Sequence, residues 1–140
     1  MPKLKYIERM EGSLETTKRL LIVEDEQVVA DFVARVLRKE GFAVDVATNG
    51  EIAQNFLGND YDLILIDIRM PLMNGKRLYE YIKLVRPELV SSVVFTSGEL
   101  VDASTLNFLS MEGRLFLHKP FGIEDLRAVV EKTLQKNRIA

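Results

Sequence analysis

Polar and charged side chains follow four short apolar runs of the chain, in an order that could assemble one chemical site. Glu24 and Asp25 follow the first run, and Asp67 follows an unbroken Leu-Ile-Leu-Ile run. A hydroxyl, Thr96, and an amine, Lys119, follow the two later runs. The carboxyl ends of the strands meet at one edge of an open α/β sheet, so we expect these groups to lie together there.

Three carboxylates brought to one place predict a site for a divalent cation. Glu24, Asp25 and Asp67 would raise one another's pKa unless a cation lay between them. Mg²⁺ fits this donor set best, because it prefers one or two carboxylates together with waters and a phosphoryl oxygen. The pattern therefore favours a site that handles phosphate.

Each of these residues also has a simpler structural interpretation. Asp25 could be the N-cap of the following helix, and Thr96 could start a turn. Lys119 could extend its charged end to solvent from the sheet edge. His118 is more readily explained as a half-exposed strand residue than as a ligand. For Asp67 the functional interpretation is favoured, because an unpaired carboxylate after a buried strand is costly.

The elements that must position these groups alternate between short apolar runs and longer segments of helical period, which is typical of repeated βα units. We expect strands at residues 20–23, 42–47, 62–66, 92–95 and 115–118, and helices at residues 28–40, 51–57, 76–85, 105–111 and 124–135. This order predicts a doubly wound, flavodoxin-like three-layer α/β/α sandwich. Its five-stranded parallel sheet would have the order 2-1-3-4-5, with the ligand crevice between strands one and three.

Composition narrows the class of protein. The 140 residues, 47% of them hydrophobic, fit one domain with one core. The absence of cysteine excludes disulfides, thiolate metal sites and a cysteine nucleophile, and favours a cytoplasmic location. No apolar run approaches the roughly 20 residues that span a bilayer, so no membrane partner is expected. Lys and Arg total 19 against 21 Asp and Glu, without a dense basic cluster, so no direct nucleic-acid partner is expected.

The four runs, LLIVEDE, DLILIDIRMPLMNG, VVFTSG and FLHKPF, resemble in order and spacing the receiver domain of two-component response regulators. The resemblance covers residues 18–137, and we place the receiver domain at 19–137. It implies a catalytic set in which Asp67 is the phosphorylation site, Thr96 the switch hydroxyl and Lys119 the family's lysine, followed by a cis proline at Pro120. Phe116 would be the aromatic switch residue that enters the space left by Thr96.

The same resemblance implies a metal site and a signalling role. Mg²⁺ would be bound directly by Asp25, Asp67 and the backbone carbonyl of Arg69, and through water by Glu24. A histidine kinase or a histidine phosphotransfer protein would supply the phosphoryl group in a phosphorelay. The face of the fourth helix, fifth strand and fifth helix would then signal to a downstream protein effector, and a homodimer is compatible with this scheme. Such a receiver is not an enzyme, beyond phosphorylating and dephosphorylating itself.

The chain departs from the common pattern of this family at four positions. Glu24 stands where many relatives have an aspartate, a conservative change with which metal binding is expected to survive. Phe116 stands where a tyrosine is frequent, so a switch that depends on a phenolic hydroxyl is not expected. Arg69 and Gly98 occupy the positions that tune loss of the phosphoryl group. Neither places an attacking water well, so we expect a long-lived phosphorylated state, unless Glu99 supplies the missing carboxylate.

The two ends of the chain are less informative. Leu4, Ile7, Met10 and Leu14 recur at helix-compatible spacing within residues 1–18, which could be a docking helix, a linker or a disordered extension. Only residues 136–140 follow the last helix, so no output domain is expected. A stand-alone receiver and one cut from a hybrid sensor kinase both fit.

Three other classes of protein use parts of this pattern. A haloacid dehalogenase-like phosphatase needs a second aspartate two residues after the first, where this chain has Arg69. A flavodoxin-like electron carrier needs a Ser, Thr and Gly-rich first loop, which the sequence EDEQ does not provide. A pseudo-receiver that only docks partners remains compatible with the fold.

Overall fold

The computed structural model describes residues 17–70, 73–98 and 102–139. Five parallel strands form one sheet in the order β2-β1-β3-β4-β5. In chain order, the strands are β1 (Arg19–Val23), β2 (Ala43–Ala47), β3 (Leu63–Asp67), β4 (Val93–Ser97) and β5 (Leu115–His118). The predicted sheet and its strand order are therefore confirmed.

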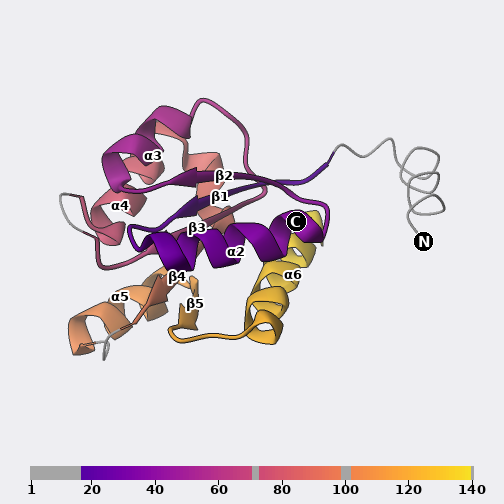
Figure 1. Ribbon diagram of the computed structural model, residues 1–140. Coiled ribbons are helices and arrows are strands. Elements are labelled where there is room, and N and C mark those ends of the chain that lie inside the picture. Colours follow the sequence, from indigo (N-terminus) through magenta and orange to yellow (C-terminus); the bar gives the residue numbers. More distant parts are fainter. Residues whose placement is uncertain (1–16, 71–72, 99–101, 140) are drawn as a thin grey trace.

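Helices cover both faces of this sheet and complete the three layers (Figure 1). They are α2 (Gln27–Lys39), α3 (Gly50–Phe56), α4 (Gly75–Val85), α5 (Ala103–Glu112) and α6 (Ile123–Ile139), with a 3-10 helix η1 (Pro87–Ser92). Buried side chains of α2 and α6 pack on one face, and those of α3, α4 and α5 pack on the other. Successive strand residues alternate between these two cores, so the central strand β3 is buried along its whole length.

Most element bounds lie within one or two residues of the expected ones, and three of the differences are informative. The strand expected from residue 92 begins one residue later, because η1 occupies the segment that starts at Pro87. Helix α5 begins earlier than expected, because the Asp102 side chain caps it by accepting a 2.7 Å hydrogen bond from the Thr105 N–H. Helix α6 continues beyond the predicted end at residue 135.

Two glycines are required by the local backbone. Gly41 has φ 100° and ends α2, as its position in the sequence predicts, because only glycine adopts this conformation without strain. Gly75 begins α4 against the end of β3. A Cβ there would lie 2.7 Å from the backbone carbonyl oxygen of Asp67, so glycine allows the loop after Asp67 to close tightly.

Part of the apolar stripe of α2 lies outside the core. Val33 and Leu37 are buried, but Val28 is 82% exposed and Phe32 is 37% exposed. The first turn of α2 follows directly on the loop at the carboxyl end of β1. This turn therefore lies beyond the edge of the sheet, and the sheet does not cover Val28. Helical periodicity identified the helix correctly but could not show that this end of the stripe is exposed.

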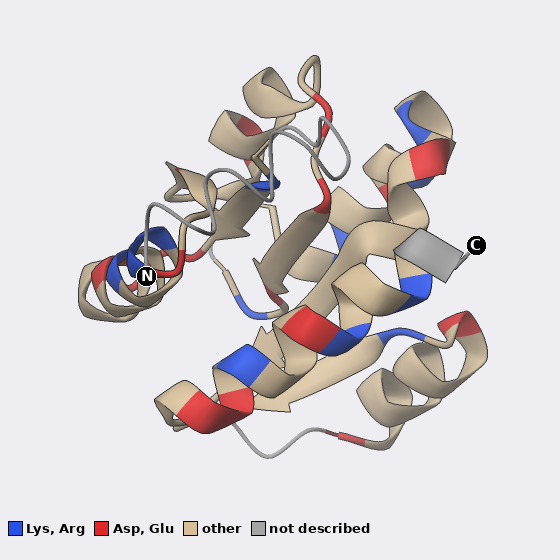
Figure 2. Cartoon of the chain, turned by 90° about the vertical axis from the view of Figure 1, so that its right-hand side faces the viewer, with Lys and Arg blue, Asp and Glu red and all other residues tan. Residues whose placement is uncertain are grey.

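Charged residues are distributed without segregation over the described chain. Figure 2 shows Lys and Arg interspersed with Asp and Glu along the helices. None of the described helices combines the length and the apolar character that crossing a membrane would require. The expected helical spacing of Leu4, Ile7, Met10 and Leu14, and the expected contribution of Glu99, fall outside the described residues.

Candidate functional site

Asp67 is the last residue of β3 and lies at the carboxyl edge of the sheet. Only 3% of the residue is exposed, and its Oδ1 accepts a 3.1 Å hydrogen bond from the backbone N–H of Arg69. On the neighbouring strand β4, Thr96 is its partner in the register. The chain therefore places a buried carboxylate at the position where open α/β sheets bind ligands.

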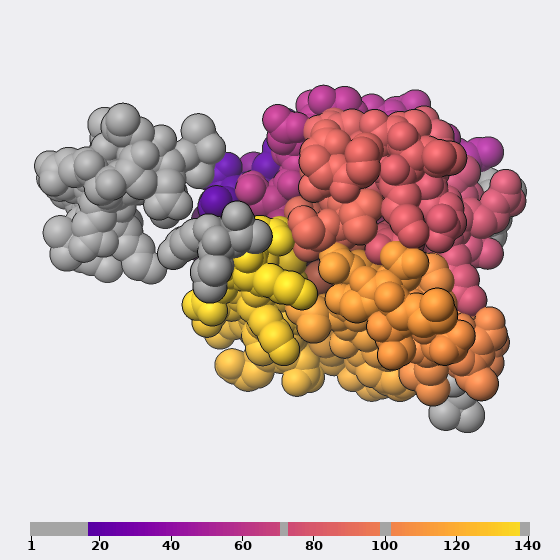
Figure 3. Space-filling model, turned by 180° about the vertical axis from the view of Figure 1, so that it is seen from behind, coloured from indigo at the N-terminus to yellow at the C-terminus, as the bar shows by residue number. Residues whose placement is uncertain are grey.

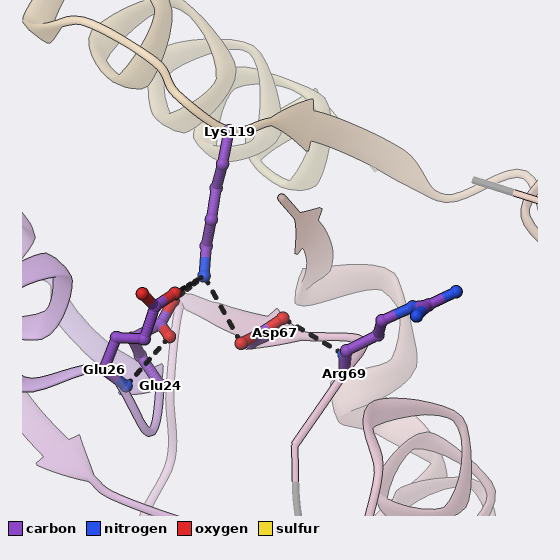
Figure 4. A network of polar contacts seen from close by, with 5 residues as sticks. All are labelled: Glu24, Glu26, Asp67, Arg69 and Lys119. Carbon is purple, nitrogen blue, oxygen red and sulfur yellow. Dashed lines mark hydrogen bonds and ion pairs between the residues drawn. The ribbon is translucent and has the colours of Figure 1, made fainter. Parts of the chain in front are cut away.

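Lys119, directly after β5, reaches this carboxylate across the edge of the sheet. Its Nζ lies 2.9 Å from Glu24 Oε1, 2.9 Å from Glu26 Oε1 and 3.3 Å from Asp67 Oδ2 (Figure 4). These residues come from the ends of three different strands: Glu24 and Glu26 lie after β1, Asp67 ends β3, and Lys119 follows β5. The order of the strands in the sheet brings these three parts of the chain together.

Three carboxylates surround the lysine. Glu24, Glu26 and Asp67 each offer an oxygen that lies within 4.8 Å of the others. Burial, followed by repulsion from Glu24, raises the pKa of Asp67 to about 7. Burial alone would lower the pKa of Lys119, but its hydrogen bonds to Glu24 and Glu26 outweigh that effect and raise it above the usual value.

The cluster contains Glu24 and Asp67, two of the three carboxylates that the sequence pattern predicts to converge. Asp25 is exposed and lines the same cavity, but Glu26 takes its place beside Glu24 and Asp67. The Glu24 N–H still donates to the Ala47 carbonyl oxygen at 3.1 Å, so the backbone continues the strand ladder past β1. Side chains alternate along such a backbone, which explains why the residues on either side of Asp25 face the site. The third acid of the Glu-Asp-Glu run was the signal that sequence reasoning missed.

Thr96 has the burial and position expected of a group that changes its contacts. It is 2% exposed, and its hydroxyl has no hydrogen-bond partner among the described residues. A buried hydroxyl without a partner is costly, so its retention at this position calls for an explanation. It stands beside Asp67 on the adjacent strand.

Two other predicted site residues lie on or after β5. Phe116 is half-buried, packs against the core on the α4 and α5 side, and has its ring centroid 6.0 Å from that of His118. The Lys119–Pro120 peptide bond is cis. Phe116 is thus on the strand that neighbours Thr96, although it makes no ring contact with the site itself.

A cavity of about 760 Å³ opens over the carboxylates and Lys119. Its polar end is formed by the acidic residues, Arg69 and Lys119. Its apolar side is formed by α2 and the segment after β5, with Val28, Val29, Phe32, Pro120 and Phe121. Helical spacing in the sequence does not distinguish this apolar side from a face that packs on the core.

Arg69 and Gly98 flank the site but do not contact Asp67 with their side chains. Figure 4 shows the Arg69 guanidinium directed away from Asp67 and Lys119. Gly98 lies against the lysine stem, where a Cβ would be 3.3 Å from Lys119 Cδ. Glycine at this position therefore leaves room for Lys119 to cross to the carboxylates.

Fold and site together define a class of protein. A β2-β1-β3-β4-β5 parallel sheet carries a buried strand-end carboxylate, further acidic groups and a lysine over one cavity. This arrangement can neutralise and orient a phosphoryl group with a cation and an ammonium. The molecule is a doubly wound α/β protein with a carboxylate site suited to phosphate chemistry.

Comparison with known families identifies the class more closely. Residues 20–131 match the family described as response regulator receiver domain. That match covers most of the chain, so the protein belongs to this family and is a module of phosphorelay signalling. Receiver domains generally bind Mg²⁺ at their acidic pocket and are not enzymes of the usual kind, and response regulators interact with histidine kinases and downstream effectors.

Curated relatives and solved structures agree with this assignment. The chain is 32% identical over 131 residues to the alkaline phosphatase synthesis transcriptional regulatory protein SphR of Synechococcus elongatus, covering 86% of this chain and 50% of that protein. It is 38% identical over 114 residues to the transcriptional regulatory protein CutR of Streptomyces coelicolor, covering 80% of this chain and 51% of that protein. The chain thus spans about half the length of these relatives.

Among solved structures, the fold is similar to a CheY-like receiver domain protein of Methanospirillum hungatei, with a TM-score of 0.80 and 25% identity over 89% of this chain and 98% of that chain. It is also similar to the receiver domain of a signal transduction histidine kinase of Syntrophus aciditrophicus, with a TM-score of 0.75 and 27% identity over 89% of this chain and 95% of that chain. The phosphatase and electron-carrier alternatives are not favoured by these findings.

Proposed function

We propose that Asp67 is the residue that accepts the phosphoryl group. The observation that carries this assignment is the position of its carboxylate, buried at the end of β3 and 3.3 Å from the Lys119 ammonium. The unpartnered hydroxyl of Thr96 on the next strand supports it, because a phosphoryl oxygen would supply the missing hydrogen-bond partner. The pseudo-receiver alternative gives no reason for either feature.

The reaction requires little covalent chemistry from the protein. An oxygen of the Asp67 carboxylate attacks the phosphorus of a partner's phosphohistidine and forms the P–O bond of an acyl phosphate. The P–N bond breaks, and its electron pair returns to the imidazole nitrogen of the partner. Lys119 would neutralise one phosphoryl oxygen, while the Arg69 N–H and the Thr96 hydroxyl would donate to others.

The residues present fit a bound Mg²⁺. Carboxylate oxygens of Glu24 and Asp67 already lie close together, and their repulsion contributes to the raised pKa of Asp67, which a cation would relieve. Asp25, Asp67 and the Arg69 carbonyl would hold the ion directly, and Glu24 would hold it through water. When bound, the cation supplies the positive charge that the transferred phosphoryl group requires.

The partner that delivers the phosphoryl group would dock over the cavity. Val28 is 82% exposed and Phe32 is 37% exposed beside the carboxylates, and both line the cavity with Phe121. Exposed apolar side chains next to a reactive group are suited to a helical partner that presents its histidine from an apolar face. We assign this docking to a histidine kinase or a histidine phosphotransfer protein.

Phosphorylation of Asp67 would change the conformation of the face formed by α5, β5 and α6. Movement of the Thr96 hydroxyl toward a phosphoryl group would open space beside β5, which Phe116 can enter. The α5, β5 and α6 face would then change shape and be recognised by a downstream effector or a second copy of the chain. We further propose that the receiver domain spans 19–137 and that residues 1–18 are an extension or linker.

The phosphorylation site is tested by intact mass spectrometry. With acetyl phosphate and Mg²⁺ the protein should gain one phosphoryl group, and Asp67→Asn should abolish the gain. Asp62→Asn is the matched control: Asp62 precedes the same strand, and its carboxylate accepts a hydrogen bond from the backbone N–H of Arg19 and pairs with Lys18. Unchanged labelling of Asp67→Asn would refute the assignment.

We also propose that the phosphorylated state lasts minutes to hours. Arg69 is directed away from Asp67 and Gly98 has no side chain, so neither places a water in line with the phosphorus. The decay of purified phosphoprotein in Mg²⁺, compared with an Arg69→Asn and Gly98→Glu double variant, measures this. Decay within seconds in the parent would contradict the proposal.

A further inference from the structure

The ammonium of Lys119 is fully occupied by carboxylates. An ammonium has three N–H donors, and Lys119 Nζ has three acidic partners, at 2.9 Å from Glu24, 2.9 Å from Glu26 and 3.3 Å from Asp67. A phosphoryl oxygen that binds Lys119 must therefore displace one of these contacts. Which partner leaves determines how easily the site accepts the phosphoryl group.

Glu26 differs from the other two partners in exposure. Its side chain is 62% exposed, whereas the side chains of Glu24 and Asp67 are each 4% exposed. The two buried carboxylates cannot leave the site without unfolding part of it, but Glu26 can turn into water. Glu24 and Asp67 also have tasks in the proposed function, and Glu26 has none.

We propose that Glu26 is a positioning residue that holds Lys119 in the resting site and competes with the incoming phosphoryl oxygen for its ammonium. This inference rests on the proposed function of Asp67. Transfer of the phosphoryl group breaks the ion pair between Lys119 and Glu26 and replaces it with one between Lys119 and a phosphoryl oxygen. No proton moves in this exchange, because both partners of the lysine are anions.

Two variants separate loss of the contact from loss of the charge. Glu26→Gln removes the charge and the ion pair, whereas Glu26→Asp keeps the charge but shortens the side chain by one methylene. If the contact holds the lysine, both variants should phosphorylate faster than the parent with acetyl phosphate at saturating Mg²⁺. One partly exposed ion pair predicts an increase of roughly two- to fivefold.

Two further measurements distinguish a positioning role from other roles. The Lys119 Cε resonance of lysine-labelled, metal-free protein should shift in both variants, because the environment of its ammonium changes. It should not shift in Asp31→Asn, which makes the same change of net charge as Glu26→Gln at an exposed residue of α2 that accepts a hydrogen bond from the Gln27 side chain. Glu26→Asp should leave the Mg²⁺ dissociation constant within about twofold of the parent value, as expected for a charge that is not a ligand.

The outcomes are separable. Parent-like rates in both Glu26 variants, with normal labelling of Asp67, would overturn this inference and leave the proposed function intact. Faster phosphorylation in Glu26→Gln alone would assign the effect to charge, and a large loss of Mg²⁺ affinity in Glu26→Asp would make Glu26 a ligand; either result overturns it. Absence of labelling in the parent protein would instead refute the proposed function.

Discussion

Helices α4 and α5 lie side by side on the same face of the sheet, but they are held very differently (Figure 3). Helix α4 buries three large side chains completely, those of Leu78, Tyr79 and Ile82. Helix α5 leaves Leu106 54% exposed and Met111 77% exposed. A helix with few buried apolar contacts opens more easily than one that is anchored in the core.

The two helices also connect to different parts of the site. Helix α4 follows β3, which ends in Asp67, and α5 follows β4, which carries the unpartnered hydroxyl of Thr96. An aromatic contact joins the two helices: Phe108 of α5 packs edge-on against Tyr79 of α4, with ring centroids 5.6 Å apart. Phe108 also packs edge-on against Phe95 of β4, with ring centroids 5.7 Å apart. The comparison indicates a fixed side that holds the carboxylate proposed to accept the phosphoryl group and a lightly held side that can respond to it.

Matched truncations on the two helices should give the largest difference. Ile82→Ala removes a side chain that is 0% exposed and should lower the free energy of unfolding by roughly 3 kcal/mol. Leu106→Ala, on α5, should change it by less than about 0.5 kcal/mol, because that side chain is already 54% exposed. Urea denaturation followed by circular dichroism measures both. Equal losses would show that α5 is anchored as firmly as α4.

The sequence predicted the fixed side better than the responsive side. The apolar run before Asp67 has strand length and no alternation, so a strand buried on both faces of the sheet could be inferred from it. In helix α5, Leu106, Phe108, Leu109 and Met111 do not form one apolar stripe, so its sequence pattern is weaker. Only its environment in the structure shows which of these side chains are buried.

In the site too, the sequence pattern predicts some residues and misses others. Strand ends predicted that Asp67, Thr96 and Lys119 would meet. The direction of each side chain in the loop after β1 depends on how far the extended backbone continues, which composition does not reveal. For this reason Glu26 was missed, and the Asp25 carboxylate was placed nearer to the cluster than the structure has it.

The burial of Asp67 and its repulsion from Glu24, both on the fixed side, give a second test of the comparison. The pKa of Asp67 is raised to about 7 by burial and by Glu24, so the folded protein binds this proton more tightly than the unfolded chain does. Without metal, the free energy of unfolding should therefore fall as pH rises from about 4 to about 7. Asp67→Asn should remove this part of the pH dependence and be more stable than the parent by roughly 2 kcal/mol at pH 8 in EDTA.

Urea denaturation of the parent and of Asp67→Asn at pH 5 and at pH 8 checks the direction of this pH dependence. The advantage of Asp67→Asn should be small at pH 5, where the parent carboxyl is mostly protonated, and larger at pH 8. Mg²⁺ should stabilise the parent more than the variant at pH 8, because a cation relieves the repulsion between Asp67 and Glu24, which the neutral amide of the variant lacks. A variant that is less stable than the parent at pH 8 in EDTA would contradict the role assigned to this repulsion.

On the responsive side, the hydroxyl of Thr96 should cost stability. Thr96→Val replaces a buried, unpartnered hydroxyl by a methyl group of similar size and should raise the free energy of unfolding by about 1 kcal/mol. Thr133→Val is the matched control: Thr133 is 3% exposed, but its hydroxyl donates to the Val129 carbonyl oxygen at 2.8 Å. The control should be neutral or destabilising. Stabilisation of both variants alike would mean that the missing partner of Thr96 has no energetic cost.

The smallest effect should come from the polar tie between the two helices. The Tyr79 hydroxyl donates to Glu112 Oε1 at 2.8 Å, and Lys83 Nζ pairs with the same carboxylate at 3.3 Å. Tyr79→Phe keeps the ring contact with Phe108 but removes this hydrogen bond. It should therefore lower the free energy of unfolding by only about 0.5–1 kcal/mol, because Lys83 still holds Glu112.

The local consequence of Tyr79→Phe should exceed its global one. Because the lost bond ties the end of α5 to the anchored helix, amide hydrogen exchange should accelerate in residues 103–112 and stay unchanged in α4. Lys83→Met is the companion variant, since it removes the exposed ion pair and leaves the Tyr79 bond in place, and it should accelerate exchange less. Uniform acceleration through both helices would show that they open as one unit, and the contrast between a fixed and a responsive helix would not hold.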